Sequence, residues 1–214
     1  MSSYKNILVL APHTDDGELG CGGTIARFLQ EGANVYYAAF STAQESVPSG
    51  FDKDILKTEV RAATKVLGIP EKQLFVYDFQ VRKLNYVRQE ILEELIQLRK
   101  KINFDLVLMP SLKDLHQDHK TIAEEGLRAF KQTNIWCYEL IWNNLSFNTQ
   151  CFVKLESKHI EKKVEALQEY RSQASRDYMS REFIFALAKT RGVQIGSSYA
   201  EAFEVIRLIL PQPE

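Results

Sequence analysis

The sequence predicts an α/β fold of three layers, in which a mainly parallel β-sheet lies between two layers of helices. Three observations predict it. Apolar runs of strand length alternate with longer stretches of helical period, most of these runs are continuously apolar, and no repeat or linker divides the 214 residues. We therefore expect one domain over residues 1–214, with an active site at the carboxyl ends of the strands.

Seven apolar runs are the predicted strands. They lie at residues 6–12, 34–41, 73–79, 105–111, 135–141, 151–155 and 203–210. Pro12 is expected to end the first strand, because proline cannot donate to a ladder. The direction of the last strand stays open, and an antiparallel strand at an edge of the sheet is one alternative.

Five stretches with apolar residues at helical spacing separate these runs. They lie at residues 18–32, 54–68, 88–101, 121–132 and 159–173. Two of them run into Gly32 and Gly68, which fits helix C-termini. The alternation of strand and helix gives a Rossmann-like layout with helices on both faces of the sheet.

Composition narrows the class of partner. The 27 basic and 28 acidic residues give a net charge of −1, so no basic field would attract nucleic acid or an anionic membrane. No apolar run approaches the ~20 residues of a membrane span, and the N-terminus runs into a strand, so we expect a cytoplasmic protein with a small-molecule partner. The three cysteines lack metal or disulfide spacing and are interpreted as packing residues. The oligomeric state is left open, a homo-oligomer included.

The first strand leads into APHTDDGELGCGGT, residues 11–24. Its glycines do not follow the G-x-G-x-x-G spacing of a dinucleotide site, and the carboxylates of Asp15 and Asp16 would repel a phosphate there. Close packing of a helix on the sheet explains the glycines more simply. A nicotinamide cofactor is therefore disfavoured.

A second polar cluster follows the strand at 105–111. Asp114, His116, Asp118 and His119 lie within six positions, and three of the four histidines in the chain fall in these two strand-end segments. Helix N-caps would explain one aspartate in each segment, Asp16 and Asp118, but not the histidines. Two imidazoles and one carboxylate form a common catalytic zinc site, and a further carboxylate would be free to act as a base.

Together these motifs closely resemble the PIG-L/LmbE-like family of zinc-dependent N-acetylsugar deacetylases. His-x-Asp-Asp with Glu-Leu-Gly-Cys-Gly-Gly-Thr follows the first strand, Asp-x-His-x-Asp-His follows a later one, and residues 59–69 and 191–206 also look like family segments. The resemblance covers nearly the whole chain and implies His13, Asp16 and His119 as ligands of Zn²⁺. Fe²⁺, Co²⁺ or Mn²⁺ would suit the same donors.

The resemblance also implies catalytic roles. Asp15 matches the general base, His116 matches a histidine that when protonated stabilises the oxyanion or protonates the leaving amine, and Asp118 would hold His116 charged and oriented. Two positions depart from the family pattern, Thr14 in place of a proline and Gly17 in place of an acidic residue, which leaves a looser turn or one shaped for another substrate. Neither Lys57 nor Arg61 aligns clearly with a family arginine that binds substrate.

Further residues at the same edge of the sheet are candidates for substrate binding. Arg82 and Lys83 follow the third strand and would meet a phosphate of a nucleotide-linked sugar, or else are two solvated surface charges. Trp142 and Asn143 follow the fifth strand and would suit a sugar ring, with a core tryptophan as the alternative. The polar segment 42–54 is either a lid or an ordinary surface loop.

We therefore expect a metal-dependent hydrolase that removes the N-acetyl group from an amino sugar or glycoconjugate precursor, such as one carrying N-acetylglucosamine. The alternative within the same chemistry is a metal-dependent amidase acting on a non-sugar acyl amide, because the motifs encode metal and base but not the sugar ring. A non-catalytic binding module is less consistent with Asp15, since a binder needs no spare base.

Overall fold

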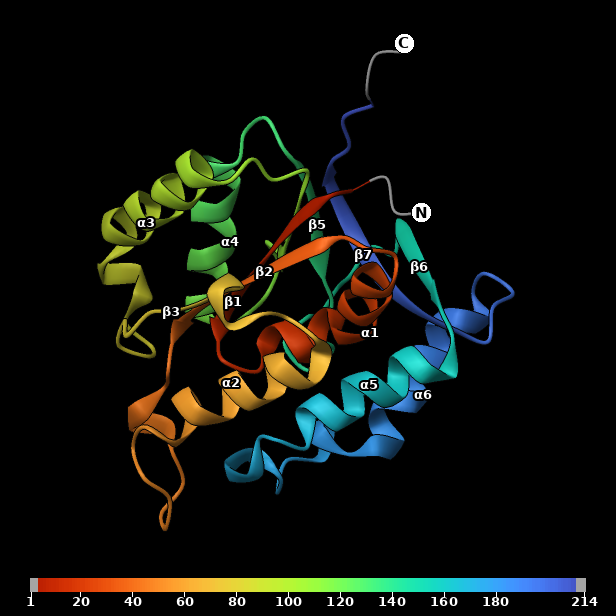
Figure 1. The fold of residues 1–214 in the computed structure, drawn as a ribbon, viewed down its shortest axis with the longest axis horizontal. Helices are drawn as coiled ribbons and strands as arrows, with labels where there is room; N and C mark the ends of the chain where they lie inside the picture. Colours follow the sequence, from red (N-terminus) through yellow and green to blue (C-terminus); the bar gives the residue numbers. More distant parts are fainter. Residues whose placement is uncertain (1–3, 211–214) are drawn as a thin grey trace.

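A computed structural model describes residues 4–210, in which seven strands form one sheet and six α-helices pack around it (Figure 1). The strands are β1 (Asn6–His13), β2 (Asn34–Ser41), β3 (Leu74–Val76), β4 (Leu106–Pro110), β5 (Asn134–Tyr138), β6 (Cys151–Leu155) and β7 (Tyr199–Arg207). The helices are α1 (Asp16–Gln30), α2 (Ile55–Leu67), α3 (Arg88–Lys101), α4 (Gln117–Ala129), α5 (Ser157–Leu167) and α6 (Arg181–Val193). Short 3₁₀ turns occur at Gln44–Ser46, Glu71–Gln73, Leu84–Tyr86, Arg171–Gln173 and Asp177–Met179.

The strand order is β3-β2-β1-β4-β5-β7-β6. The first five strands in this order are parallel, and β7 runs antiparallel to both β5 and β6. The predicted α/β class and mainly parallel sheet are confirmed. The last strand is indeed antiparallel, but its expected place at an edge is wrong, because β6 pairs along its outer side.

Helices cover both faces of the sheet, α1, α2, α5 and α6 on one and α3 and α4 on the other (Figure 1). Alternate side chains of β1 explain the two layers: Ile7, Val9 and Ala11 enter one apolar cluster, while Leu8 and Leu10 enter the other. Every strand residue of β4 is buried, as the continuous apolar run predicted.

The C-termini of two helices confirm the glycine signals. Gly68 caps α2 in the left-handed region (φ 98°) and Gly32 follows α1 with φ 90°. Pro12, by contrast, does not end β1, which continues to His13. The pairing of β1 with β4 ends at Val9, and beyond Val9 β1 pairs with β2 alone. Pro12, which has no N–H to donate, is tolerated because the side of β1 that faces β4 needs no ladder bond there.

Helix α6 is absent from the sequence prediction. Its buried residues are Ile184, Ala188 and Gly192, a single narrow row at spacing four, while Phe183 and Phe185 are half-buried and blur the helical period. No helix of the described residues is long and apolar enough to cross a bilayer.

Candidate active site

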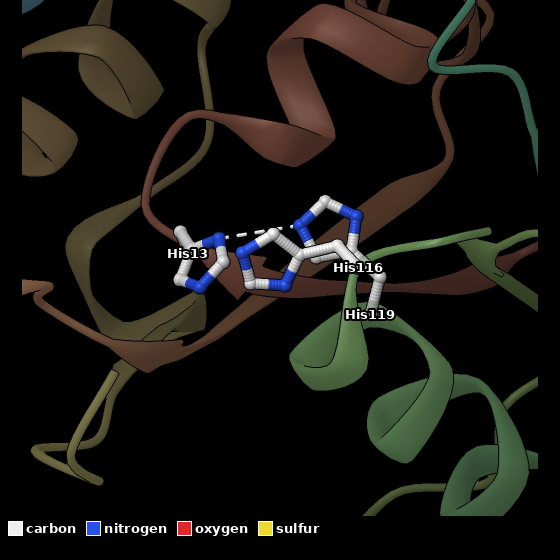
Figure 2. A group of neighbouring side chains, drawn as sticks. All are labelled: His13, His116 and His119. Carbon is white, nitrogen blue, oxygen red and sulfur yellow. Dashed lines mark hydrogen bonds between the residues drawn. The ribbon is translucent and has the colours of Figure 1, made fainter. Parts of the chain in front are cut away.

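The site lies where β1 and β4 end and α1 and α4 begin, at the carboxyl edge of the sheet (Figure 2). A cavity of about 270 Å³ opens there. Its lining includes every residue predicted for the site except Asp118, namely His13, Asp15, Asp16, Arg82, His116, His119, Trp142 and Asn143. Two segments more than 100 residues apart in the chain are thus brought to one cavity, as the sheet topology requires.

Three donor atoms converge at equal separations. His13 Nδ1 and His119 Nε2 are 3.2 Å apart, and each lies 3.2 Å from Asp16 Oδ2. Figure 2 shows the imidazoles of His13, His116 and His119 facing one another, with the contact between His13 and His119 marked. The backbone N–H of His13 also donates to Asp16 Oδ2 at 2.8 Å, which fixes the carboxylate across the turn.

These separations fit a divalent metal. A tetrahedral ion with ligands at ~2.05 Å would place its donor atoms about 3.3 Å apart, close to the three distances here. Two imidazoles and a carboxylate suit zinc, iron, cobalt or manganese. His13, His116 and His119 also offer ligand atoms within 4.8 Å of one another, but the set with Asp16 is tighter and is the one that the resemblance implied.

Each of the two converging histidines has its other ring nitrogen on a buried carboxylate. His13 Nε2 lies 3.0 Å from Asp118 Oδ2, and His119 Nδ1 lies 2.9 Å from Asp114 Oδ2. Such contacts set the tautomer of a metal-binding histidine and hold its ring, because the second nitrogen must carry the proton. Asp114 therefore belongs to the site, a role that the sequence analysis did not give it.

The structure corrects the role expected for Asp118. Its carboxylate accepts bonds from His13, from the backbone N–H of Arg82 at 2.6 Å and from that of Leu84 at 3.3 Å, not from His116. Asp118 instead ties the loop after β3 to the histidine of β1. The bond between Asp118 and His116 is a different one: the backbone N–H of Asp118 donates to Nδ1 of His116 at 3.2 Å.

His116 is also the N-cap of α4, and the N-cap position of α1 is Asp15. Neither Asp16 nor Asp118 therefore caps its helix, in contrast to the alternative interpretation. Because Nδ1 of His116 accepts a hydrogen bond, a neutral His116 carries its proton on Nε2. Burial, together with the nearby His119 and His13, lowers the pKa of His116 to about 4. In the metal-free protein this pKa favours the neutral ring, which offers an N–H donor; the charged form that the resemblance implies stays a prediction.

The electrostatic environment favours the charged forms of His13, His119 and Asp16. Burial alone would lower the pKa of His13, but Asp16 and the hydrogen bond to Asp118 raise it to about 9. Burial likewise opposes the charge on His119, yet Asp16 and the hydrogen bond to Asp114 raise its pKa to about 10. The pKa of Asp16 is lowered by both histidines in spite of its burial. The site is therefore a strongly polar cluster inside an apolar fold.

Asp15 stands beside this set at the N-cap position of α1 without capping the helix through its side chain. Burial and, after it, the charge of Asp16 raise the pKa of Asp15 to about 6. A carboxylate with a pKa near the working pH, lining the cavity, is suited to accept a proton and return it.

The turn that carries these carboxylates is held from both sides. The carbonyl oxygen of Thr14 accepts hydrogen bonds from the hydroxyls of Tyr37 at 2.8 Å and Tyr170 at 2.7 Å, and both tyrosines contact the buried Glu18. A Cβ on Gly17 would lie 2.5 Å from the Tyr37 ring. The turn is therefore tight, and Tyr37 explains why glycine replaces an acidic residue there.

The three predicted substrate-binding residues form separate parts of the cavity wall. Arg82 has a left-handed backbone (φ 65°), and with Ala43 it is one of two non-glycine residues with positive φ among residues 4–210, both of them in the lining. Trp142 is 37% exposed and stacks on Tyr178 at 4.1 Å between ring centroids. It is therefore not a core tryptophan. Asn143 bonds through its backbone to Leu140 and Leu115.

The cavity has a further wall that the sequence analysis missed. Gln173, Arg176 and Tyr178 come from the segment between α5 and α6, and the guanidinium of Arg176 donates to the side chains of both others. No strand precedes this segment, so the rule that ligands lie at strand ends does not find it. From the segment 42–54, Ala43 and Ser46 also line the cavity.

Comparison with known proteins gives a match to one protein family and to two similar deacetylases. Residues 8–130, more than half of it, match the PIG-L family, described as GlcNAc-PI de-N-acetylase. The uncharacterized deacetylase YaiS of Escherichia coli is 26% identical over 174 residues, covering 78% of this chain and 91% of that protein. The diacetylchitobiose deacetylase of Thermococcus kodakarensis is 29% identical over 137 residues, covering 60% of this chain and 50% of the enzyme.

Solved structures share the fold. The N,N'-diacetylchitobiose deacetylase of Pyrococcus horikoshii, complexed with its inhibitor MPG, aligns with a TM-score of 0.79 and 21% identity over 95% of this chain and 84% of its own. The conserved protein TT1542 of Thermus thermophilus aligns with a TM-score of 0.78 and 27% identity over 97% of each chain. GalB, a 4-carboxy-2-hydroxymuconate hydratase of Pseudomonas putida, aligns at 0.76 with 19% identity, over 98% of this chain and 99% of its own. The likeness to GalB shows that the fold alone does not identify an enzyme, but the family match over residues 8–130 covers more than half of the chain, and the chain belongs to the PIG-L family.

Proposed function

We propose that this protein is a zinc-dependent hydrolase that removes the N-acetyl group from an amino sugar or sugar conjugate and releases acetate. The observation that carries the proposal is the set of His13 Nδ1, Asp16 Oδ2 and His119 Nε2, mutually 3.2 Å apart beside the spare carboxylate of Asp15. Two deacetylases among the similar proteins support the reaction class.

A divalent ion held by His13, Asp16 and His119 would supply Lewis-acid polarisation of the amide carbonyl and make a water molecule more acidic. Asp15 takes the proton of the attacking water and gives it to the amine nitrogen as the C–N bond breaks. The Nε2–H of His116 donates to the carbonyl oxygen as negative charge develops on it, and one such donor is worth about 3 kcal/mol of barrier. Asp114 and Asp118 keep the two metal-binding rings in place.

The cavity supports a substrate group about the size of one sugar ring. Its volume of about 270 Å³ is near the lower end for ligand sites. The proposed sugar contacts are Trp142 and Asn143 on one wall and Arg82 on another. Since Tyr178 stacks on Trp142, a sugar would meet the edge of this aromatic pair or its outer side.

The second candidate is an amidase for a non-sugar acyl amide, and it is favoured by the same metal and base, which do not depend on the ring. A panel separates the two. Zinc-loaded protein is incubated with N-acetylglucosamine, diacetylchitobiose, larger N-acetylated sugar conjugates, acetylated amino acids and acetylated alkylamines, with chelated protein as the control, and acetate is measured.

Acetate from the sugars alone supports the proposal. If the acetylated alkylamines have the same kcat/KM as the acetylated sugars, the amidase function replaces the proposed one. No acetate from any substrate with zinc bound would overturn both.

A further inference from the structure

Helix α1 is broken shortly after the residues that form the site. Cys21 has φ −148° and ψ 24°, outside the helical region, so the first turn from Asp16 is separated from the rest of α1. A break of this kind removes helical partners from carbonyl groups before it and from N–H groups after it. In a buried helix these groups must find other partners.

Two buried side chains of opposite charge meet this need. Lys163 of α5 donates from Nζ to the carbonyl oxygen of Leu19 at 2.7 Å, and Glu201 of β7 accepts from the backbone N–H of Gly23 at 3.1 Å and of Thr24 at 2.7 Å. Lys163 Nζ and Glu201 Oε1 are themselves 2.7 Å apart, and both side chains are 7% exposed.

The signs of the charges match the two helix ends. The cation lies at the C-terminal end of the first turn, where carbonyl dipoles are negative, and the carboxylate lies at the N-terminal start of the second segment, where N–H dipoles are positive. Neighbouring glycines make room for the arrangement, since a Cβ on Gly22 would lie 2.9 Å from Cγ of Lys163. The sequence around the break is thus shaped for this ion pair.

A short chain of bonds links the pair to the proposed base. The N–H of Leu19 donates to the carbonyl oxygen of Asp15 at 3.0 Å, while the carbonyl of the same residue receives Lys163. The side chain of Leu19 also lines the cavity. A shift of Lys163 would therefore be passed to the backbone of Asp15 within one helical turn.

Stability alone is a weak reason for this pair, because well-packed apolar residues often replace a buried ion pair without loss of stability. We propose that Lys163 and Glu201 are positioning residues, which orient Asp15 and Asp16 toward the reacting centre by fixing the break in α1 at Cys21. The catalytic part of this inference rests on the proposed function.

The test compares wild type with Lys163→Met/Glu201→Gln, which removes both charges at once. A matched control is Arg191→Met/Glu139→Gln, which removes another largely buried ion pair; it borders the same small cavity as Lys163 and Glu201 but donates its hydrogen bonds to no backbone group of α1. Hydrogen exchange is followed by mass spectrometry on peptides covering residues 14–24, in metal-free and zinc-loaded protein, and kcat and KM are measured on the best acetylated substrate.

We expect faster exchange at 14–24 in the first variant and wild-type exchange there in the control. We also expect kcat to fall about tenfold to a hundredfold, since misplacement by ~1 Å has effects of that size, with KM within about threefold. Gly22→Ala keeps both charges but displaces the lysine stem, so it should reproduce the same pattern, and it serves if the double variant does not fold.

Wild-type protection at 14–24 together with wild-type kcat in the variants would overturn the inference. An equal fall of kcat in the control would also overturn it, since the effect would then be one of general destabilisation. If wild type itself releases no acetate from any substrate, the proposed function fails, while the exchange measurement still decides whether the pair fixes the turn that carries Asp15.

Discussion

Replacing Asp114 by asparagine should weaken metal binding although Asp114 itself is not a proposed ligand. Its two oxygens have separate partners: Oδ2 lies 2.9 Å from Nδ1 of His119, and Oδ1 accepts from the backbone N–H of His116 at 2.8 Å. The Asp114→Asn side chain has the same shape but one oxygen in place of two. In either orientation its NH₂ group therefore faces one of these two donors.

The magnitude follows from the burial of the contact. The side chains of Asp114 and His119 are 1% and 2% exposed, so water cannot replace the lost bond. A buried hydrogen bond to a charged group contributes about 1.5–3 kcal/mol, which corresponds to about tenfold to a hundredfold in an equilibrium constant. Loss of a carboxylate behind a metal-binding histidine has effects in the same range.

The assay is a competition titration of Zn²⁺ between the protein and a chromogenic chelator of known affinity, at fixed pH. Asp105→Asn is the control, because Asp105 also has two hydrogen-bond partners, the backbone N–H groups of Lys5 and Asn6, both on Oδ2, but lies near the start of β4 and far from the site. The reasoning is refuted if Asp114→Asn binds zinc as tightly as the Asp105 control.

Three further predictions concern the base, the packing of α1 and the support of the cavity wall. Asp15→Asn should retain its metal and lose about a hundredfold or more of kcat, because the proton acceptor is removed; elemental analysis with an acetate assay checks both, and wild-type turnover would exclude Asp15 as the base. Gly20→Ala should lower stability by about 1–3 kcal/mol in denaturant unfolding, since its Cβ would lie 2.2 Å from the ring of Tyr138; an unchanged midpoint would show that the ring moves freely. Glu59→Gln should lower stability by about 1–3 kcal/mol, because the buried Glu59 carboxylate accepts both the N–H and the hydroxyl of Ser172; a midpoint equal to that of wild type would contradict this.

The fold was predictable where the pattern is local. Strands 34–41 and 151–155 and the helix at 88–101 have the bounds expected from their apolar spacing. The order of β6 and β7 was not predictable, because strand pairing across a sheet depends on long-range contacts that apolar spacing does not encode. Short edge strand β3 was predicted too long, since the regular ladder with β2 covers Leu74–Val76, and beyond it Tyr77 and Phe79 each donate a backbone N–H bond to Ala39 and Phe40 of β2.

The site was predictable to the level of residue type and sheet edge. His13, Asp16 and His119 do converge, because the carboxyl ends of β1 and β4 are neighbours in a parallel sheet. The partners of Asp118 and Asp114 were not predictable, since both carboxylates lie within five residues of His116 and His119, and the fold also brings His13 close to Asp118. The resemblance implied that Asp118 holds His116, whereas the Asp118 carboxylate lies 3.0 Å from Nε2 of His13.

The central claim is that His13, Asp16 and His119 hold one metal ion while His116 does not bind it. Metal content of Asp16→Ala and His116→Ala, purified side by side and reconstituted with Zn²⁺, tests this most directly. We predict about one zinc per chain in His116→Ala and in wild type, and loss of zinc in Asp16→Ala. Zinc retained in Asp16→Ala and lost in His116→Ala would show that the three histidines form the metal site and would contradict the account.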